Sequence, residues 1–270
     1  MFLIILIFVL LIVYLLLVKS IHDLSIPTKS FLSLKVPGKE KTNVLVIYPH
    51  PDDELMSGGL IQMLTNRNDF KVFMVSTTKG EHGDEILKLP PKELALVRSI
   101  EYSKVAKTLG VKNFELWNFT DGNMPSEENE LKNKILDFIS QNKIDLIVTY
   151  EKFGMYGHPD HIALSKVISQ VSDSLKIKAI YATFPKKILK RINLPKTLTY
   201  KDRVVELKLD SISKPEFKIN VTFKSLKTYL AGKHYKSQSR GSTIEQLMFA
   251  LFGNFEYYTT KYDELMFKSK

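Results

Sequence analysis

The chain has 270 residues, no cysteine and a formal net charge of +10. The lack of cysteine excludes structural disulfides, thiolate zinc sites and a cysteine nucleophile. The positive charge is concentrated between residues 186 and 240, which hold fifteen Lys or Arg and four acids, a balance of +11 against −1 for the remaining chain. This lysine-rich region is either a solvated surface or one that attracts anionic lipid or a phosphate-bearing substrate. It lacks the aromatic interleaving and the motifs of nucleic-acid-binding regions, so we predict no nucleic-acid partner.

The N-terminal 18 residues form a separate apolar segment. From Phe2 to Val18 the chain has no charge, glycine or proline, and Tyr14 carries the only polar side chain. As a helix this segment would be about 26 Å long, at the short end for a bilayer crossing. A cleaved signal peptide is the alternative, but no basic residue precedes Phe2 and residues 19–22 make a poor cleavage site. We predict a single-pass transmembrane anchor at 1–18, with the rest of the chain in the cytoplasm because lysines follow the segment.

A tether at 19–42 is predicted to lead into a catalytic domain at 43–270. This length is enough for one α/β domain with a substantial core. Strand and helix candidates alternate, which predicts a Rossmann-like, mostly parallel sheet with helices on both faces. The strand candidates are 44–47, 70–76, 114–117, 145–150, 177–183 and 203–209. The helix candidates are 55–65, 91–109, 128–141, 161–175, 217–230 and 244–252, and residues 185–200 are predicted to be a loop or insertion.

The first strand candidate runs directly into Tyr48-Pro49-His50-Pro51-Asp52-Asp53-Glu54. The carboxyl end of a strand is where open α/β sheets bind ligands. Three consecutive acids repel one another, so a fold that keeps them together usually supplies a cation or shifts a pKa. The motif therefore indicates a metal site, although an ordinary turn with a helix-capping Asp52 would have the same sequence.

A second group of polar residues follows the strand candidate at 145–150. The loop there ends in His158-Pro159-Asp160-His161. Imidazole and carboxylate together suit zinc, which in catalytic sites usually has three protein ligands and one water. His50, one of Asp52 or Asp53, and one of His158 or His161 would form that set.

Other cofactor motifs are absent from the sequence. Gly58-Gly59 follows the first strand but is not a dinucleotide-binding turn, and no phosphate-binding Gly-Lys-Ser/Thr is present. The segment 79–84 contains glycines and charged residues, and we interpret it as a flexible loop at the rim of the pocket.

The two motifs resemble those of the PIG-L/LmbE-like family of zinc-dependent de-N-acetylases, over roughly residues 43–238. The resemblance implies Zn²⁺, or another divalent metal, bound by His50, Asp53 and His161. It implies that Asp52 is the general base and that His158 polarises the amide or stabilises the oxyanion. It also implies substrate contacts by Arg98, Asp121 and His234, within an Arg98–Glu101 pair, an Asp-Gly element and a late His-x-x-Ser-Gln element.

The predicted function is that of a metal-dependent amidase that removes acetyl from an N-acetylglucosamine-type glycoconjugate, with N-acetylglucosaminyl-phosphatidylinositol as one candidate. Membrane lipid is a predicted partner through the N-terminal helix and the lysine-rich region. The alternative is a non-catalytic, membrane-anchored metal- or lipid-binding module with the same fold. Asp52 argues against that alternative, because a binding module needs no general base.

Overall fold

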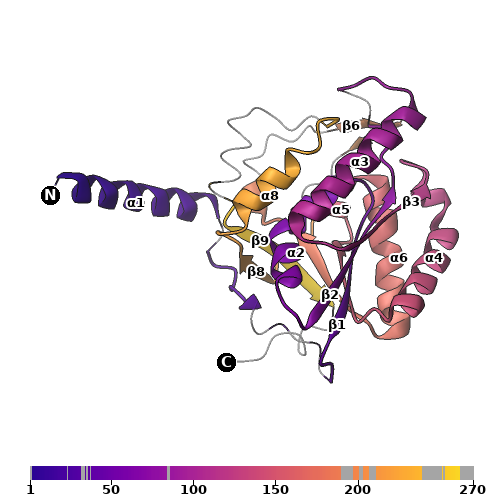
Figure 1. Cartoon of the computed structure of the whole chain (residues 1–270), viewed down its shortest axis with the longest axis horizontal. Coiled ribbons are helices and arrows are strands. Elements are labelled where there is room, and N and C mark those ends of the chain that lie inside the picture. Colours follow the sequence, from indigo (N-terminus) through magenta and orange to yellow (C-terminus); the bar gives the residue numbers. More distant parts are fainter. Residues whose placement is uncertain are drawn as a thin grey trace.

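A seven-stranded sheet with the order β3-β2-β1-β4-β5-β9-β8 forms the centre of the structure (Figure 1). The computed structural model describes residues 2–22, 24–31, 34, 36, 38–83, 86–189, 197–200, 203–206, 211–238, 251 and 253–261. The first five strands of this order are parallel, and β9 runs antiparallel to both β5 and β8. The strands are β1 (Thr42–Tyr48), β2 (Phe70–Thr78), β3 (Asn113–Phe119), β4 (Leu146–Tyr150), β5 (Lys178–Thr183), β8 (Phe217–Asn220) and β9 (Phe255–Lys261).

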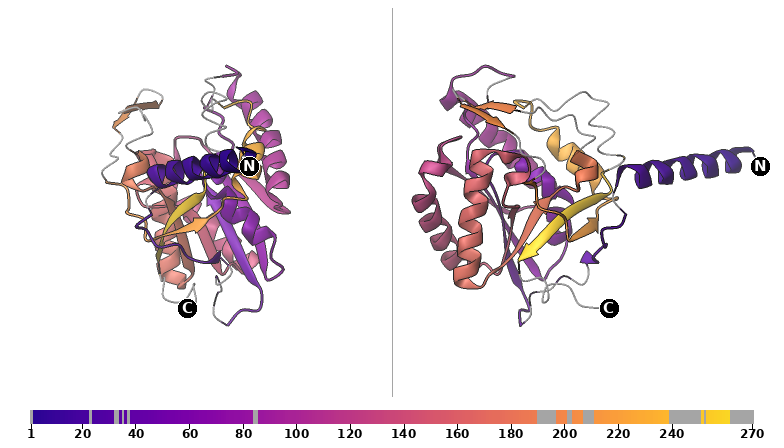
Figure 2. Two further views of the ribbon diagram at one scale, coloured as in Figure 1. Left: turned by 90° about the vertical axis from the view of Figure 1, so that its left-hand side faces the viewer. Right: turned by 180° about the vertical axis from the view of Figure 1, so that it is seen from behind.

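Helices cover both faces of the sheet (Figures 1 and 2). On β1, Val44, Val46 and Tyr48 pack in one core, and Leu45 and Ile47 pack in the other. Successive side chains of a strand point to opposite faces, so a sheet covered twice needs such an uninterrupted apolar strand. The first core includes residues of α2 (Gly58–Thr65), α3 (Pro91–Leu109) and α8 (Ser225–Gly232). The second includes residues of α4 (Glu128–Asn142) and α6 (Pro159–Leu175).

The strand order reverses between β1 and β4, which are neighbours in the sheet. The two histidine motifs follow these two strands, so the fold brings them to the same point of the carboxyl edge. A reversal of this kind is where open α/β sheets leave a crevice for a ligand. Shorter elements surround the edge or lie beyond it: η2 (Asp53–Ser57), η3 (Met124–Ser126), α5 (Gly154–Gly157), α7 (Lys186–Leu189), and the pair β6 (Thr197–Tyr200) and β7 (Arg203–Glu206).

The mostly parallel sheet with helices on both faces is confirmed, but the predictions for the last third of the chain need correction. The predicted helix at 217–230 is wrong at its start, which is strand β8, and only its later part overlaps α8. The predicted strand at 203–209 is not in the main sheet, because β7 pairs with β6. Strand β9 was not predicted, and the predicted loop at 185–200 contains α7 and β6. The predicted helix at 244–252 lies outside the described residues except for Leu251.

The N-terminal helix α1 (Phe2–Ile21) projects from the domain (Figure 1). Among the described residues it is the one helix long and apolar enough to cross a membrane, and a signal sequence has the same properties. The segment predicted to be a tether packs on the domain. Ile26, Phe31 and Leu34 are buried, and Thr28 forms a bridge with Lys218 of β8.

Glu256 connects β9 to the start of α2. Its carboxylate accepts hydrogen bonds from the amides of Gly59 (2.6 Å) and Leu60 (2.9 Å) and from the hydroxyl of Tyr258 (2.7 Å). Burial nevertheless raises the pKa of Glu256 to about 7. Since the folded-state pKa is above the unfolded value, protonated Glu256 stabilises the fold at acid pH, and this contribution is lost as the pH rises towards 7.

We therefore predict that Glu256→Gln, which cannot ionise, becomes more stable relative to the wild type as the pH rises. The gain in the free energy of unfolding between pH 5 and pH 8 should be on the order of 2 kcal/mol. Urea unfolding of both proteins, followed by circular dichroism at several pH values, measures this difference. Parallel pH profiles for the two proteins would show that Glu256 ionises normally.

Candidate metal centre

The first motif follows β1 and is fixed to the end of β2 through the carbonyl of Pro49. This oxygen accepts hydrogen bonds from the backbone amide and the hydroxyl of Thr78, both at 2.9 Å. Asp52 then adopts a left-handed backbone with φ of 105° and precedes the turn of η2. A left-handed conformation is costly for a residue other than glycine and is often found at functional sites. It separates two neighbouring carboxylates: Asp53 turns towards the histidines, while Oδ2 of Asp52 lies 3.9 Å from Nη2 of Arg98.

The second motif is placed by the start of α6. His158 caps this helix, and its Nδ1 accepts a hydrogen bond from the amide of Asp160 at 3.2 Å. His161 lies in the first turn, with Nδ1 at 3.1 Å from the carbonyl oxygen of Gly154. Gly154 has a φ of +60°, and a Cβ at this position would be 2.3 Å from Cβ of His161. Only glycine therefore permits this close approach.

The two motifs meet at three buried atoms. Nδ1 of His50 lies 3.2 Å from Oδ2 of Asp53 and 3.2 Å from Nε2 of His161. Nε2 of His161 lies 3.4 Å from the same Asp53 oxygen. Ligands about 2.1 Å from a tetrahedral zinc ion are separated by about 3.4 Å, so the three atoms have the spacing of a metal-ligand set.

The hydrogen bonds on the far side of each imidazole determine where its proton lies. Nε2 of His50 is 3.1 Å from both Oδ1 of Asp121 and Oδ2 of Asp160, and carboxylates accept hydrogen bonds. The proton is therefore on Nε2 of His50 and, by the same argument with Gly154, on Nδ1 of His161. The lone pairs of both rings then point towards Asp53, where they repel unless a proton or a cation lies between them. This arrangement fits a divalent metal, with the far-side partners orienting the ligands.

The pKa shifts show that this cluster favours an added positive charge. Burial opposes protonation of His50, but Asp121, Asp160 and Asp53 raise its pKa well above the ordinary value. Burial alone would raise the pKa of Asp53, but His161 and His50 hold it well below its usual range. Burial, with the nearby rings of His161 and His50, lowers the pKa of His158 to about 2. His158 is therefore neutral at physiological pH, and because its Nδ1 accepts a hydrogen bond, its proton is on Nε2.

Of the residues predicted from the sequence, the structure brings His50, Asp53 and His161 together. The ring of His158 lies 4.9 Å from the rings of both other histidines. Arg98 is buried and donates hydrogen bonds to the carbonyls of Gly80 and Pro51, which joins the 79–83 loop to the first motif. The late Ser-Gln element also reaches this region, since Ser237 binds Glu101 and Gln238 donates to the carbonyl of Gly83.

Two predicted substrate contacts have other partners in the structure. Asp121 is buried against His50 and is held there by the amide of His82 at 3.0 Å, so its carboxylate orients an imidazole. Nε2 of His234 lies 3.0 Å from the hydroxyl of Thr108 on α3. Thr108 is ten residues beyond Arg98 on that helix, about 15 Å along its axis, so the structure does not bring His234 to the histidine cluster.

Several contributing residues were not identified from the sequence. Asp160 binds His50, and its only signal was its place in the second motif. Tyr150, the last residue of β4, donates to Oδ1 of Asp53 at 2.9 Å and stacks on His161 at 4.6 Å. Burial raises the pKa of Glu54 to about 8, and its carboxyl group accepts a hydrogen bond from Tyr235 at 2.7 Å.

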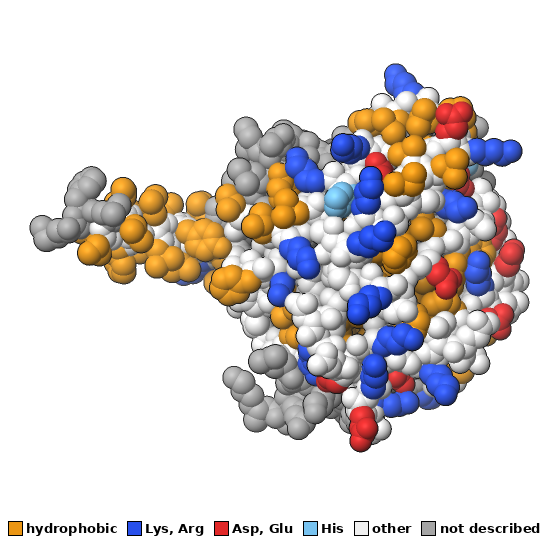
Figure 3. Space-filling model, in the orientation of Figure 1, with side chains coloured by type: hydrophobic (Ala, Val, Ile, Leu, Met, Phe, Trp, Pro, Cys, Tyr) orange, Lys and Arg blue, Asp and Glu red, His pale blue; other side chains and the backbone are white. Residues whose placement is uncertain are grey.

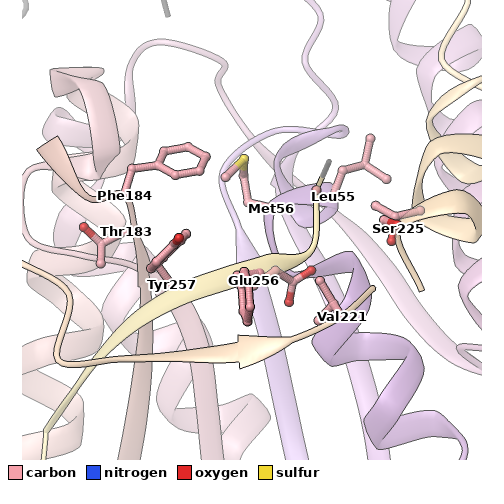
Figure 4. Close-up of a pocket in the computed structure, with 11 residues that line it drawn as sticks. Leu55, Met56, Thr183, Phe184, Val221, Ser225, Glu256 and Tyr257 are labelled. Carbon is pink, nitrogen blue, oxygen red and sulfur yellow. The ribbon is translucent and has the colours of Figure 1, made fainter. Parts of the chain in front are cut away.

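An apolar pocket adjoins the first motif (Figure 4). Leu55 and Met56 of η2 line one side, and Phe184 and Tyr257 lie across from them. None of the residues that line it belongs to the His50–Asp53–His161 set. The pocket is therefore a neighbour of the candidate metal centre and not part of it.

Fold and site together define an α/β protein with a buried His–Asp–His centre at the reversal of its strand order. Residues 45–172 match the sequence model of the PIG-L family, described as GlcNAc-PI de-N-acetylase. This stretch includes both histidine motifs. This part of the chain is therefore similar to the PIG-L family.

A curated relative is similar in sequence, and solved structures are similar in fold. The chain is 31% identical over 136 residues to diacetylchitobiose deacetylase from Thermococcus kodakarensis, covering 50% of each chain. It spans about half the length of that curated relative. The fold is similar to that of N,N'-diacetylchitobiose deacetylase from Pyrococcus horikoshii (TM-score 0.60, 20% identity, 82% of this chain and 84% of that one). It is also similar to GalB, the 4-carboxy-2-hydroxymuconate hydratase of Pseudomonas putida KT2440 (TM-score 0.62, 11% identity, 85% and 100%).

We predict that Asp53→Asn and His161→Ala lose stoichiometric binding of a divalent metal, because each removes one of the three converging ligands. Asp121→Asn removes only an orienting partner of His50 and should weaken binding about 10- to 100-fold. Isothermal titration of the metal-free proteins measures both effects, and Asp137→Asn on the exposed face of α4 serves as the control. Binding that survives in Asp53→Asn and disappears in Asp121→Asn would move the ion to the other side of His50.

Proposed function

We propose that the protein is a zinc-dependent deacetylase that hydrolyses the acetamido group of an N-acetylglucosamine-type glycoconjugate. The observation that carries this proposal is the convergence of His50, Asp53 and His161 within a stretch that is similar to the PIG-L family. Two imidazoles and one carboxylate are a usual ligand set for catalytic zinc, and other divalent metals accept the same donors. When bound, the metal would polarise the substrate carbonyl and lower the pKa of its water.

Amide hydrolysis also needs a base for the nucleophile and stabilisation of the oxyanion. We assign the base to Asp52, whose side chain is 31% exposed and whose strained backbone separates it from Asp53. We assign the oxyanion contact to His158, because the neutral ring keeps its proton on Nε2 and can donate it in a hydrogen bond. Tyr150 and Asp121 would hold the ligands in place during the reaction.

The comparisons and α1 support the proposed substrate class. The family description names GlcNAc-PI, and the relative's name refers to diacetylchitobiose. An anchor at α1 would favour a membrane-linked conjugate such as N-acetylglucosaminyl-phosphatidylinositol over a soluble sugar. With Lys19 and later lysines after the apolar segment, we place the domain on the cytoplasmic side.

A second candidate is a non-catalytic metal-binding module on this fold. A hydratase has a similar fold, so the fold alone does not determine the reaction. The conformation of Asp52 favours catalysis over mere binding. Ligand binding does not require this carboxylate, yet the chain holds it in a strained conformation beside the metal motif.

We predict that Asp52→Asn binds zinc normally and loses about 10²- to 10⁴-fold in kcat, the usual effect of removing a general base. Acetate release from acetylated glucosaminyl conjugates measures activity, and metal content is determined on the same samples. The wild type should lose activity with a chelator and regain it when zinc is added back. Asp137→Asn is again the matched control.

Two outcomes would contradict different parts of this account. Near-normal turnover by Asp52→Asn would remove Asp52 from the mechanism and leave the metal centre unaffected. A zinc-loaded wild type that releases no acetate from a soluble or a lipid-linked N-acetylglucosaminyl conjugate would favour the binding module.

A further inference from the structure

A strip of exposed apolar side chains lies on α8 and on the turn before it. Phe223 is 95% exposed, Leu226 58% and Leu230 51%. Leu226 and Leu230 are four residues apart and lie on the same side of α8, and Phe223 is in the turn that leads into it. The segment from Val221 to Gly232 contains no acid, and its charged residues are Lys224 and Lys227. Figure 3 shows apolar side chains over α8 close to the foot of α1.

Hydrogen bonds tie this strip to α1. Nδ2 of Asn254 donates to the hydroxyl of Tyr14 at 2.8 Å and to Oγ1 of Thr222 at 3.1 Å. The Tyr14 hydroxyl in turn donates to the carbonyl of Leu251 at 3.3 Å. Thr222 immediately precedes Phe223, so one amide group links the turn that carries Phe223 to Tyr14, which lies inside the apolar part of α1.

The length of α1 then places the strip in the membrane. The part of α1 before Tyr14, residues 2–13, is about 18 Å long. The hydrocarbon core of a bilayer is about 30 Å thick. If α1 crosses the bilayer, Tyr14 and the four residues after it must lie in the apolar layer, and Phe223 enters with them. Lys224 and Lys227 would reach the anionic headgroups, as lysines beside inserted apolar groups do.

We propose that Phe223, Leu226 and Leu230 insert into the leaflet next to the foot of α1 and form a second membrane contact of the domain. This proposal rests on the anchor role of α1 in the proposed function. The apolar strip supplies the insertion, and the neighbouring lysines add attraction to anionic lipid. Two contacts on one domain fix its orientation on the bilayer, which an anchor alone does not.

The lack of cysteine allows a direct test on the full chain. Single-cysteine variants Phe223→Cys and Leu226→Cys are labelled with an environment-sensitive fluorophore and reconstituted into vesicles of phosphatidylcholine and phosphatidylserine. Leu10→Cys reports on α1. Leu96→Cys is the matched control, because Leu96 is 68% exposed on α3 and lies outside the strip. We expect a blue shift and quenching by doxyl-labelled lipid at positions 223, 226 and 10, and neither effect at position 96.

The outcomes separate the docking proposal from the anchor and from catalysis. Quenching at position 10 without quenching at 223 and 226 would overturn the docking proposal and keep the anchor. No quenching at position 10 would overturn both. Disulfide cross-linking of two copies at position 223 without lipid quenching would make the strip a dimer face and also overturn the proposal. Acetate release from the same vesicles tests the proposed enzyme independently of these signals.

Discussion

The candidate centre depends on the interactions that His50 makes through both nitrogens of its ring. One nitrogen of its ring faces Asp121 and Asp160, and the other faces Asp53 and His161. Three buried carboxylates thus surround one imidazole, which can neutralise at most one of them. Burying unpaired charge is costly, so an additional cation at the Asp53 side would balance the cluster. The carboxylates that orient the ring of His50 by hydrogen bonds also add buried negative charge, which a bound metal ion would balance.

The order of the strands in the sheet is what brings the residues of this cluster together. The reversal of strand order places the ends of β1 and β4 side by side, and each end carries one histidine motif. Local geometry then selects among neighbouring polar residues. The left-handed backbone of Asp52 separates two carboxylates, and the missing side chain of Gly154 lets His161 approach. The strained and closely packed positions therefore occur where the chemistry requires them.

The sequence predicted the parallel half of the sheet and the converging residues, because both motifs end apolar strands. It did not distinguish Asp52 from Asp53, or His158 from His161, since spacing alone says nothing about backbone conformation; that choice came from the family resemblance. The antiparallel edge was not predicted. Strand β8 has four residues and is followed closely by α8, so its alternation merges with a helical pattern. The interaction of Asp121 with Nε2 of His50 joins residues far apart in the chain, and no local sequence pattern indicates it.

The most direct test of the central claim is the structure of the metal-loaded protein, with the ion located by anomalous scattering. We predict one ion bound by Nδ1 of His50, Nε2 of His161 and a carboxylate oxygen of Asp53, each about 2.0–2.2 Å away. Asp121 and Asp160 should remain on the opposite nitrogen of His50. An ion bound instead by Nε2 of His50 with Asp121 and Asp160, or no ion at this position in zinc-saturated protein, would contradict the account.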